Sequence, residues 1–208
     1  MSLEIWLSFV LASSALLAVP GPTVMLVVSY ALGRGRSAGW ATVPAVTLGD
    51  FTAMTVSLLG AGAVLAASAS LFAVLKYIGA AYLVWLGIKL WRSKPHLDDV
   101  AISKAASSQK SMFWNAYVVT TLNPKGIVFF VAFVPQFVDL SRPTFVQFAI
   151  LEATFLVLAF LNILAWAVLA AKLRSRFKRP DTLRLVNRIG GSFLIGAGIL
   201  TATLRRNT

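Results

Sequence analysis

EIWLSFVLASSALLAVPGPTVMLVVSYA, residues 4–31, is an apolar stretch long enough to cross a lipid bilayer, and Pro20, Gly21 and Pro22 lie well inside it. Proline has no amide hydrogen and clashes with the preceding helical turn, so a helix should break at this point. A break frees backbone groups that lipid cannot hydrogen-bond, and these are tolerated only where they face protein or water. The stretch therefore predicts a broken transmembrane helix whose break faces the interior of a bundle.

A second stretch is interrupted in the same way. MFWNAYVVTTLNPKGIVFFVAFVPQFV, residues 112–138, is also long and apolar, and Asn123, Pro124 and Lys125 lie at a comparable depth within it. The free amides and the dipole at the start of a half-helix can bind an anionic group such as a carboxylate. A proline kink that only shapes the bundle is the alternative. Two breaks at corresponding positions favour a binding site.

The composition of the whole chain is that of a membrane protein. Of its 208 residues, 58% are hydrophobic and 12% are charged, and the mean hydropathy is +0.81, so an ordinary water-soluble domain is excluded. The apolar runs predict six spans, at about 4–31, 40–66, 71–91, 112–138, 145–171 and 187–204. We therefore expect a single transmembrane transporter domain over residues 1–208, with no room for a separate soluble domain.

The basic residues predict the orientation of the chain. The formal net charge is +12, but the basic residues lie in loops between apolar spans, which argues against a nucleic-acid partner. Most of them, from Arg34 and Arg36 to the cluster between Lys172 and Arg188, fall in the loops after the first, third and fifth spans. The positive-inside rule places these loops in the cytoplasm and both chain termini outside.

The two halves of the chain resemble each other. Residues 78–88 (IGAAYLVWLGI) match residues 189–199 (IGGSFLIGAGI) at an offset of 111, and an offset of 102 aligns the two proline breaks and places Glu152 at the position of Asp50. Because each half has three spans, the second enters the membrane upside down, as in the inverted-topology repeats of many secondary transporters. Glycines that recur for close helix packing are the alternative explanation. We expect repeat 1 at about 1–96, a cytoplasmic connector at about 97–111 and repeat 2 at about 112–208.

Two ionisable residues lie near the middle of predicted spans. Asp50 is about 15 Å into the second span, at roughly 1.5 Å per residue, and Lys125 adjoins the break in the fourth. Each charge costs roughly 2.5 to 3.5 kcal/mol unless it is paired or hydrated, so both should face the bundle interior. Asp50 is predicted to carry a proton or to bind a substrate ammonium group. Lys125 either anchors a substrate carboxylate, pairs with Asp50 or caps free carbonyl groups.

The remaining polar residues offer weaker candidates. Glu152, a second candidate for proton coupling, lies near the outer end of its span and can reach water. A polar path is predicted to draw on Thr23, Asn115, Thr120, Thr121, Gln136 and Asn162. The chain has no cysteine, and its one histidine, His96, lies in a loop, so no metal site and no cofactor are expected. No Ser/His, paired-carboxylate or metal-ligand spacing stands out in the spans, so the chain is not expected to be an enzyme.

Three segments carry a resemblance to the LysE/RhtB family of amino-acid exporters: PGPTVMLVVSYALGRGRSAGW from Pro20, LGD at residues 48–50, and TLNPKGIVFFVAFVPQFVD from Thr121. The resemblance covers nearly the whole chain in order. Its motif positions are Pro20, Gly21, Pro22, Asp50, Asn123, Pro124 and Lys125, whereas Glu152 is not part of the pattern. It implies an exporter in a bacterial cytoplasmic membrane, driven by proton antiport. The implied substrates are homoserine, its lactone, threonine, leucine or basic amino acids.

The leading hypothesis is an exporter in which the two breaks, with Thr23, hold the substrate while Asp50 changes protonation between inward-open and outward-open states. An inorganic cation transporter, as in the wider superfamily, is the alternative, but soft metals are disfavoured because the spans lack cysteine and histidine. An intramembrane enzyme or a scaffold for partner proteins is a third possibility. The expected partners are an amino acid, protons and the lipid bilayer. Small-residue faces on the third and sixth spans can pack within one protomer or between two, which leaves a homo-oligomer open.

Overall fold

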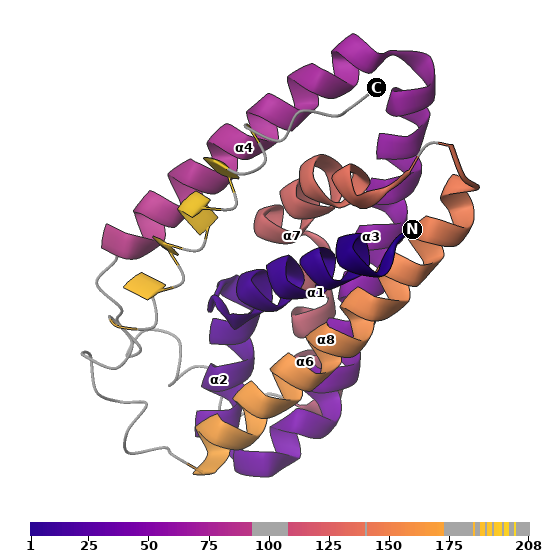
Figure 1. The fold of residues 1–208 in the computed structure, drawn as a ribbon. Coiled ribbons are helices and arrows are strands. Elements are labelled where there is room, and N and C mark those ends of the chain that lie inside the picture. The colour runs from indigo at the N-terminus through magenta and orange to yellow at the C-terminus, as the bar shows by residue number, and fades with distance from the viewer. Residues whose placement is uncertain are drawn as a thin grey trace.

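The computed structural model describes residues 1–92, 108–139 and 141–172, together with scattered residues between 185 and 202. The regular structure of these residues is entirely helical, which confirms the all-α prediction (Figure 1). The helices are α1 (Leu3–Ala18), α2 (Pro22–Arg34), α3 (Gly39–Ala67), α4 (Ala69–Arg92), α6 (Gln109–Thr121), the short α7 (Pro124–Val128) and α8 (Thr144–Lys172).

Most helix bounds agree with the predicted spans. Helices α3, α4 and α8 begin and end within two residues of the predicted 40–66, 71–91 and 145–171. Helix α6 begins at Gln109, earlier than predicted, because the side chain of Ser108 accepts a hydrogen bond from the backbone N of Ser111 and caps the helix. The connector at 97–111 and the sixth span at 187–204 lie largely outside the described residues, as does His96. The described residues of the sixth span are helical.

Three helical stretches of the described chain are long and apolar enough to cross a membrane. They are Pro22–Ala63, Gln109–Phe137 and Thr144–Lys172, and Leu3–Ala18 is a shorter apolar helix. Such stretches identify a multi-pass membrane protein. The number of six spans stays a prediction.

Both predicted helix breaks are present. Helix α1 ends at Ala18 and α2 begins at Pro22, with Gly21 extended between them. Helix α6 ends at Thr121 and α7 begins at Pro124, after an extended Asn123. Proline is the first residue of each new helix, where its missing amide has no intrahelical partner to lose. After α7 the backbone passes through a π-helical turn (Phe129–Phe133) and a 3-10 turn (Val134–Phe137), so the second half of the predicted span 112–138 is not one regular helix.

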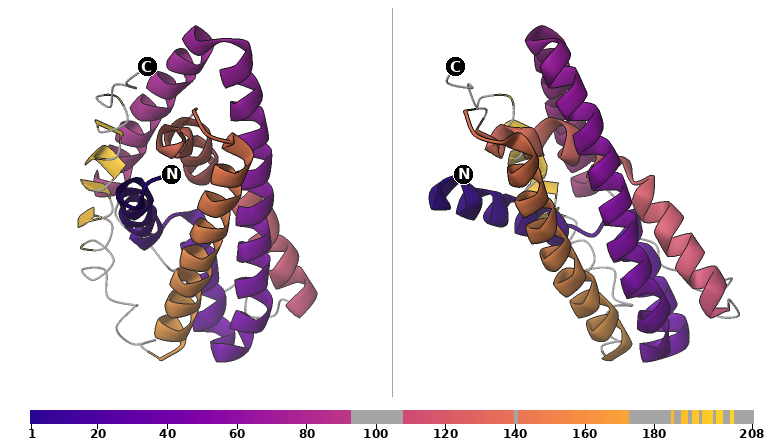
Figure 2. Two further views of the ribbon diagram at one scale, coloured as in Figure 1. Left: turned by 45° about the vertical axis from the view of Figure 1, so that its right-hand side comes forward. Right: turned by 90° about the vertical axis from the view of Figure 1, so that its right-hand side faces the viewer.

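Helices α3 and α8 run antiparallel through the bundle; α6 packs on α3, and α1 and α2 pack on α8 (Figures 1 and 2). Helix α1 lies across α8 instead of alongside it (Figure 2), and its C-terminal residues Leu16 and Val19 are buried. The buried core forms two clusters of apolar side chains. One includes Val24 and Ile163, and the other includes Leu16, Val19 and Phe155.

Basic residues gather at one end of the bundle. Helix α2 ends at Arg34, where Gly35 adopts φ +69°, a conformation that favours glycine. The 3-10 turn Gly35–Ala38, with Arg36, leads into α3 and contacts α8, which ends at Lys172. The Gln109 side chain at the start of α6 donates to the backbone O of Ser37 at 3.0 Å. The ends of four helices therefore meet at this basic end.

Candidate functional site

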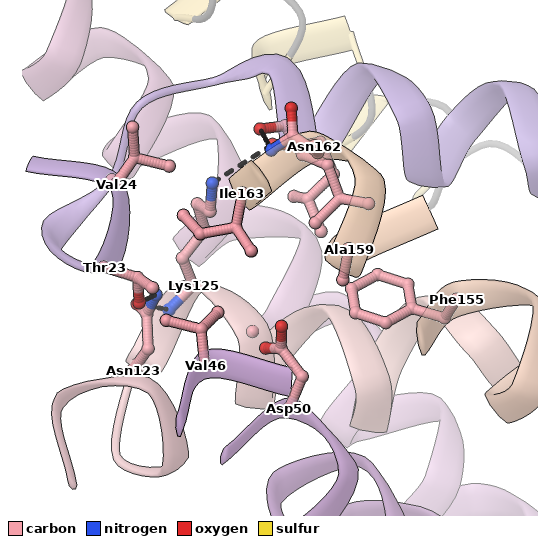
Figure 3. A pocket seen from close by; sticks show the side chains of 14 residues that line it. Thr23, Val24, Val46, Asp50, Asn123, Lys125, Phe155, Ala159, Asn162 and Ile163 are labelled. Carbon is pink, nitrogen blue, oxygen red and sulfur yellow. Dashed lines mark hydrogen bonds between the residues drawn. The ribbon is translucent and has the colours of Figure 1, made fainter. Parts of the chain in front are cut away.

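The two helix breaks face each other in the bundle interior (Figure 3). Asn123 Nδ2 donates a hydrogen bond to Thr23 Oγ1 at 3.2 Å, and Thr120 Oγ1 donates to the same oxygen at 3.3 Å. Asn123 Oδ1 accepts from the backbone N of Lys125 at 3.1 Å, so this residue caps α7 and holds α2 at the same time. All these side chains are buried, where polar groups need such partners.

Lys125 reaches from the second break to the end of α1. Its Nζ donates hydrogen bonds to the backbone O of Val19 at 2.9 Å and of Leu16 at 3.1 Å, and the side chain is only 8% exposed. The last carbonyls of a helix have no intrahelical partner, and the helix dipole makes that end favourable for a cation. Of the three arrangements that the sequence left open for Lys125, this structure contains the carbonyl cap.

Gly21 makes room for the Lys125 side chain. A Cβ atom added at Gly21 would lie 3.4 Å from Cε and 3.5 Å from Nζ of Lys125. The lysine stem therefore packs directly against the backbone of the first break. An alanine Cβ would make an ordinary van der Waals contact with Lys125 here, whereas a side chain larger than alanine would displace the ammonium group from the α1 carbonyls.

Asp50, on α3, is half-buried beside this cluster. Its carboxyl group forms no hydrogen bond or ion pair with any residue that the structure describes. Lys125 is nevertheless close enough to interact with it electrostatically. A carboxyl group within a membrane protein that lacks a fixed partner is free to bind a proton or a cationic ligand.

A cavity of about 40 Å³ lies among these residues (Figure 3). It is lined by side chains and backbone from α1, α2, α3, α7 and α8, including Gly21, Thr23, Asp50, Asn123 and Lys125. It lies where the two apolar clusters of the core meet, since members of both contribute to its walls. Its volume suffices for about one water molecule. The site as it stands is therefore too small for an amino acid.

The structure brings most predicted substrate-site residues together. Gly21, Thr23, Asn123 and Lys125 line the cavity, whereas Pro20, Pro22 and Pro124 do not line it but lie in the two breaks that shape it. Of the predicted polar path, Thr23 and Asn162 line the cavity. Thr120 does not line the cavity but bonds to Thr23, which does. The remaining three bond elsewhere: Asn115 to the Tyr30 hydroxyl, Thr121 to the backbone O of Gly49, and Gln136 to that of Ala132.

Glu152 lies apart from the cavity. Its Oε1 accepts a hydrogen bond from Thr55 Oγ1 on α3, and it is not among the residues that line the cavity. Asp50, which the sequence offset of 102 aligns with Glu152, does line it. The two carboxyl groups aligned by that offset therefore have different surroundings.

Sequence reasoning offered a carbonyl cap as one role for Lys125 but did not identify the carbonyl groups that form the site. The carbonyl oxygens of Leu16 and Val19 bind the Lys125 ammonium group, and that of Leu17 accepts a hydrogen bond from Asn162 Nδ2 at 2.9 Å. Apolar side chains give no signal for this role, because any residue supplies a carbonyl. The signal that exists is Pro20, which ends the helix and frees these carbonyls.

Comparison with known proteins agrees with this architecture. The model of the family described as LysE type translocator matches residues 14–204. The chain is 30% identical to a homoserine/homoserine lactone efflux protein of Salmonella typhi, covering 99% of each chain. It is 27% identical to a leucine efflux protein of Enterobacter sp., covering 97% of this chain and 96% of that one, and 32% identical to an uncharacterized membrane protein of Vibrio cholerae, covering 99% and 100%. No solved structure matches. The chain therefore belongs to the LysE type translocator family, and it is a membrane transporter and not an enzyme.

Proposed function

We propose that this protein exports amino acids or close derivatives across the bacterial cytoplasmic membrane in exchange for protons. Relatives named for homoserine, homoserine lactone and leucine efflux support the substrate class. The observation that carries the proposal is the Lys125 ammonium group on the carbonyls of Leu16 and Val19. An amino acid brings an ammonium group with the same hydrogen-bonding needs.

In this proposal the substrate ammonium group replaces that of Lys125 at the end of α1. The displaced Lys125 then pairs with the substrate carboxylate, beside the first free amides of α2. The cavity is too small for an amino acid as it stands, and the movement of the lysine stem away from Gly21 provides part of the added space. Lys125 thus caps the α1 carbonyls when no substrate is bound and binds the substrate carboxylate when one is bound. These are two of the three roles predicted for it.

Asp50 is the proposed proton carrier. It lines the cavity and has no hydrogen-bond or ion-pair partner among the described residues, so in this proposal a proton and a substrate ammonium group compete for the same carboxylate. Because Asp50 binds either a proton or the substrate, the site changes the side that it faces carrying one or the other. This exchange of substrate for proton is antiport. Glu152 is the second candidate for the proton carrier. It is the weaker candidate because its carboxyl group lies outside the cavity and accepts a hydrogen bond from Thr55.

We further propose that six spans form two inverted three-helix repeats. Under the offset of 111, Ala80 corresponds to Gly191 and Gly87 to Gly198. A Cβ added at Gly87 would lie 2.6 Å from the O of Gly191, and one at Gly198 would lie 2.7 Å from the O of Ala80. Gly87 thus contacts the counterpart of Ala80, and Ala80 contacts the counterpart of Gly87. Two contacts that are related in this way are the pattern that a two-fold axis produces. These glycines pack within one protomer, so they do not require a homo-oligomer.

The helix breaks follow the same reciprocal pattern. Under the offset of 102, Gly21 corresponds to Asn123 and Thr23 to Lys125. Gly21 contacts Lys125, and Thr23 bonds with Asn123. The proposed axis therefore passes between the two breaks, where inverted-repeat transporters bind their substrates. With the basic end of the bundle in the cytoplasm, both termini lie outside.

The proposal is tested by efflux from proteoliposomes preloaded with radiolabelled amino acids, including homoserine and leucine. We expect export of at least one of them to accelerate when the outside is made acidic, since protons then flow inward. Empty liposomes and liposomes with the Asp50→Asn variant are the controls. Retention of every amino acid in the panel, with and without the gradient, would contradict the proposal. Export of inorganic cations instead would favour the alternative function.

A further inference from the structure

A second, larger cavity lies on the outside of the bundle, between the start of α3 and the last turns of α8. Its volume is about 450 Å³, within the range of sites that bind small molecules. Apart from Arg36 its lining is apolar, and Trp40 and Phe160 are exposed to 86% and 42%. None of its lining residues belongs to the cavity between the breaks. It is therefore a separate groove that faces lipid.

Two small residues, Gly39 and Ala167, line this groove. Gly39 and Ala167 lie opposite each other, and a Cβ added at Gly39 would be 3.9 Å from that of Ala167. The wall on α3 contains Pro44, which lacks the amide that would bond the carbonyl of Trp40 in a regular helix. Close approach of α3 and α8 at Gly39 and Ala167, with the exposed side chains of Trp40 and Phe160 nearby, leaves a largely apolar groove.

Positive charge marks one end of the groove. Arg36 lines it, and Arg34 and Lys172 are at the same end of the bundle. No acidic side chain of the described chain pairs with Arg34 or Arg36. Trp40, next to Arg36 in the lining, is a residue type that prefers the level of the lipid headgroups. The groove thus has an apolar part that faces the lipid chains and, at the level of the headgroups, Arg36 with Arg34 nearby, neither of which pairs with an acidic side chain of the described residues.

We propose that this groove binds one anionic phospholipid, with an acyl chain along α3 and α8 and the headgroup phosphate at Arg36. Basic pockets between helices at the membrane surface bind phospholipid headgroups through this combination of charge and apolar contact. A second copy of the chain would fit the groove less well. A two-fold contact through this face would bring two identical basic rims together, and like charges disfavour that.

The probe is phosphatidylglycerol, offered with an equal amount of the zwitterionic phosphatidylcholine to the full chain in detergent. Native mass spectrometry counts the lipids bound to each protein. We expect one phosphatidylglycerol to bind in preference to phosphatidylcholine. Arg36→Gln is expected to weaken phosphatidylglycerol binding about fivefold, the effect of one interfacial cation. Arg36→Lys is expected to retain most of the binding.

Two control variants separate recognition by this groove from general attraction. Arg142→Gln removes an exposed charge at the opposite end of α8 and is expected to leave lipid binding unchanged. Val168→Trp fills the groove and is expected to weaken binding of either lipid, and size-exclusion chromatography checks that each variant is folded. Equal binding of the two lipids by the wild-type chain would overturn the proposal, as would wild-type affinity in Arg36→Gln. A dimer that Val168→Trp abolishes, without selective lipid binding, would show a second copy to be the occupant.

Discussion

Replacing Lys125 by methionine separates its role in transport from its role in folding. Methionine is one atom shorter than lysine but keeps an unbranched stem that can contact Gly21, and it has no hydrogen-bond donor. The ammonium group then no longer bonds the carbonyls of Leu16 and Val19. In the proposed mechanism the variant also lacks the cation that binds the substrate carboxylate. We expect it to fold and to transport poorly.

The magnitudes explain why folding should survive. Two hydrogen bonds from a charged donor are worth about 1.5 to 3 kcal/mol each. Removing a buried charge recovers about 2.5 to 3.5 kcal/mol. The carbonyl of Leu16 also retains its bond from the backbone N of Val19, at 3.2 Å, so the loss falls mainly on the carbonyl of Val19. The net destabilisation is therefore about −0.5 to 3.5 kcal/mol, nearer the lower end because the Leu16 carbonyl keeps a partner, and the apparent Tm falls by at most about 14 °C.

Transport should change far more than stability. A lost charge-assisted hydrogen bond to the carboxylate lowers substrate affinity by about tenfold to a hundredfold. The assay is efflux from proteoliposomes over a range of internal substrate concentrations, with thermal unfolding in detergent measured on the same preparation. Lys89→Met, which removes an exposed lysine near Trp85, is the matched control. Wild-type efflux by a folded Lys125→Met protein would refute the reasoning, and failure to fold would show that Lys125 is chiefly structural.

Other predictions use the same preparations. Asp50→Asn is expected to abolish gradient-driven efflux in a folded, membrane-inserted protein, because an amide keeps the shape of the carboxyl group but carries no proton; wild-type coupling would remove Asp50 from the mechanism. Glu152→Gln is expected to reduce coupling less, since its carboxyl group lies outside the cavity, and an equal loss would make both carboxyl groups carriers. Gly191→Ala places a Cβ 2.5 Å from the O of Gly87 and should lower stability by about 1 to 3 kcal/mol, seen as a lower apparent Tm. Gly196→Ala, with nothing within 4 Å, is its control and should be neutral or slightly stabilising.

The sequence predicted the helices and their breaks well because both depend on local properties. Apolar length decides whether a segment can span a membrane, and proline decides where its backbone hydrogen bonding fails. For the same reason Gly21, Thr23, Asn123 and Lys125 were found together in the cavity: they belong to breaks that have to face the interior. These inferences needed no knowledge of how the helices pack.

The direction of the Lys125 side chain was beyond the reach of the sequence. Pairing with Asp50 and capping of carbonyls were both compatible with its depth, and the choice depends on the position of α1. That helix lies across the bundle (Figure 2), and its apolar residues do not reveal this tilt. The position of α1 also brings the carbonyl of Leu17 within hydrogen-bond distance of Asn162. The hydrogen bond between Thr55 and Glu152 was likewise not indicated by any sequence pattern.

The two proposed repeats differ in one hydrogen bond near the helix breaks. Asn162 on α8 bonds the carbonyl of Leu17 and so ties α8 to the end of α1. Under the offset of 102, Gly60 stands at the corresponding position of the first repeat, and it has no side chain to form the matching bond. Exchange of the two repeat conformations during the proposed transport cycle therefore loses this hydrogen bond without forming an equivalent one. At about 0.5 to 1.5 kcal/mol per bond, the present conformation is favoured roughly twofold to tenfold, a bias that bound substrate or a proton on Asp50 has to overcome.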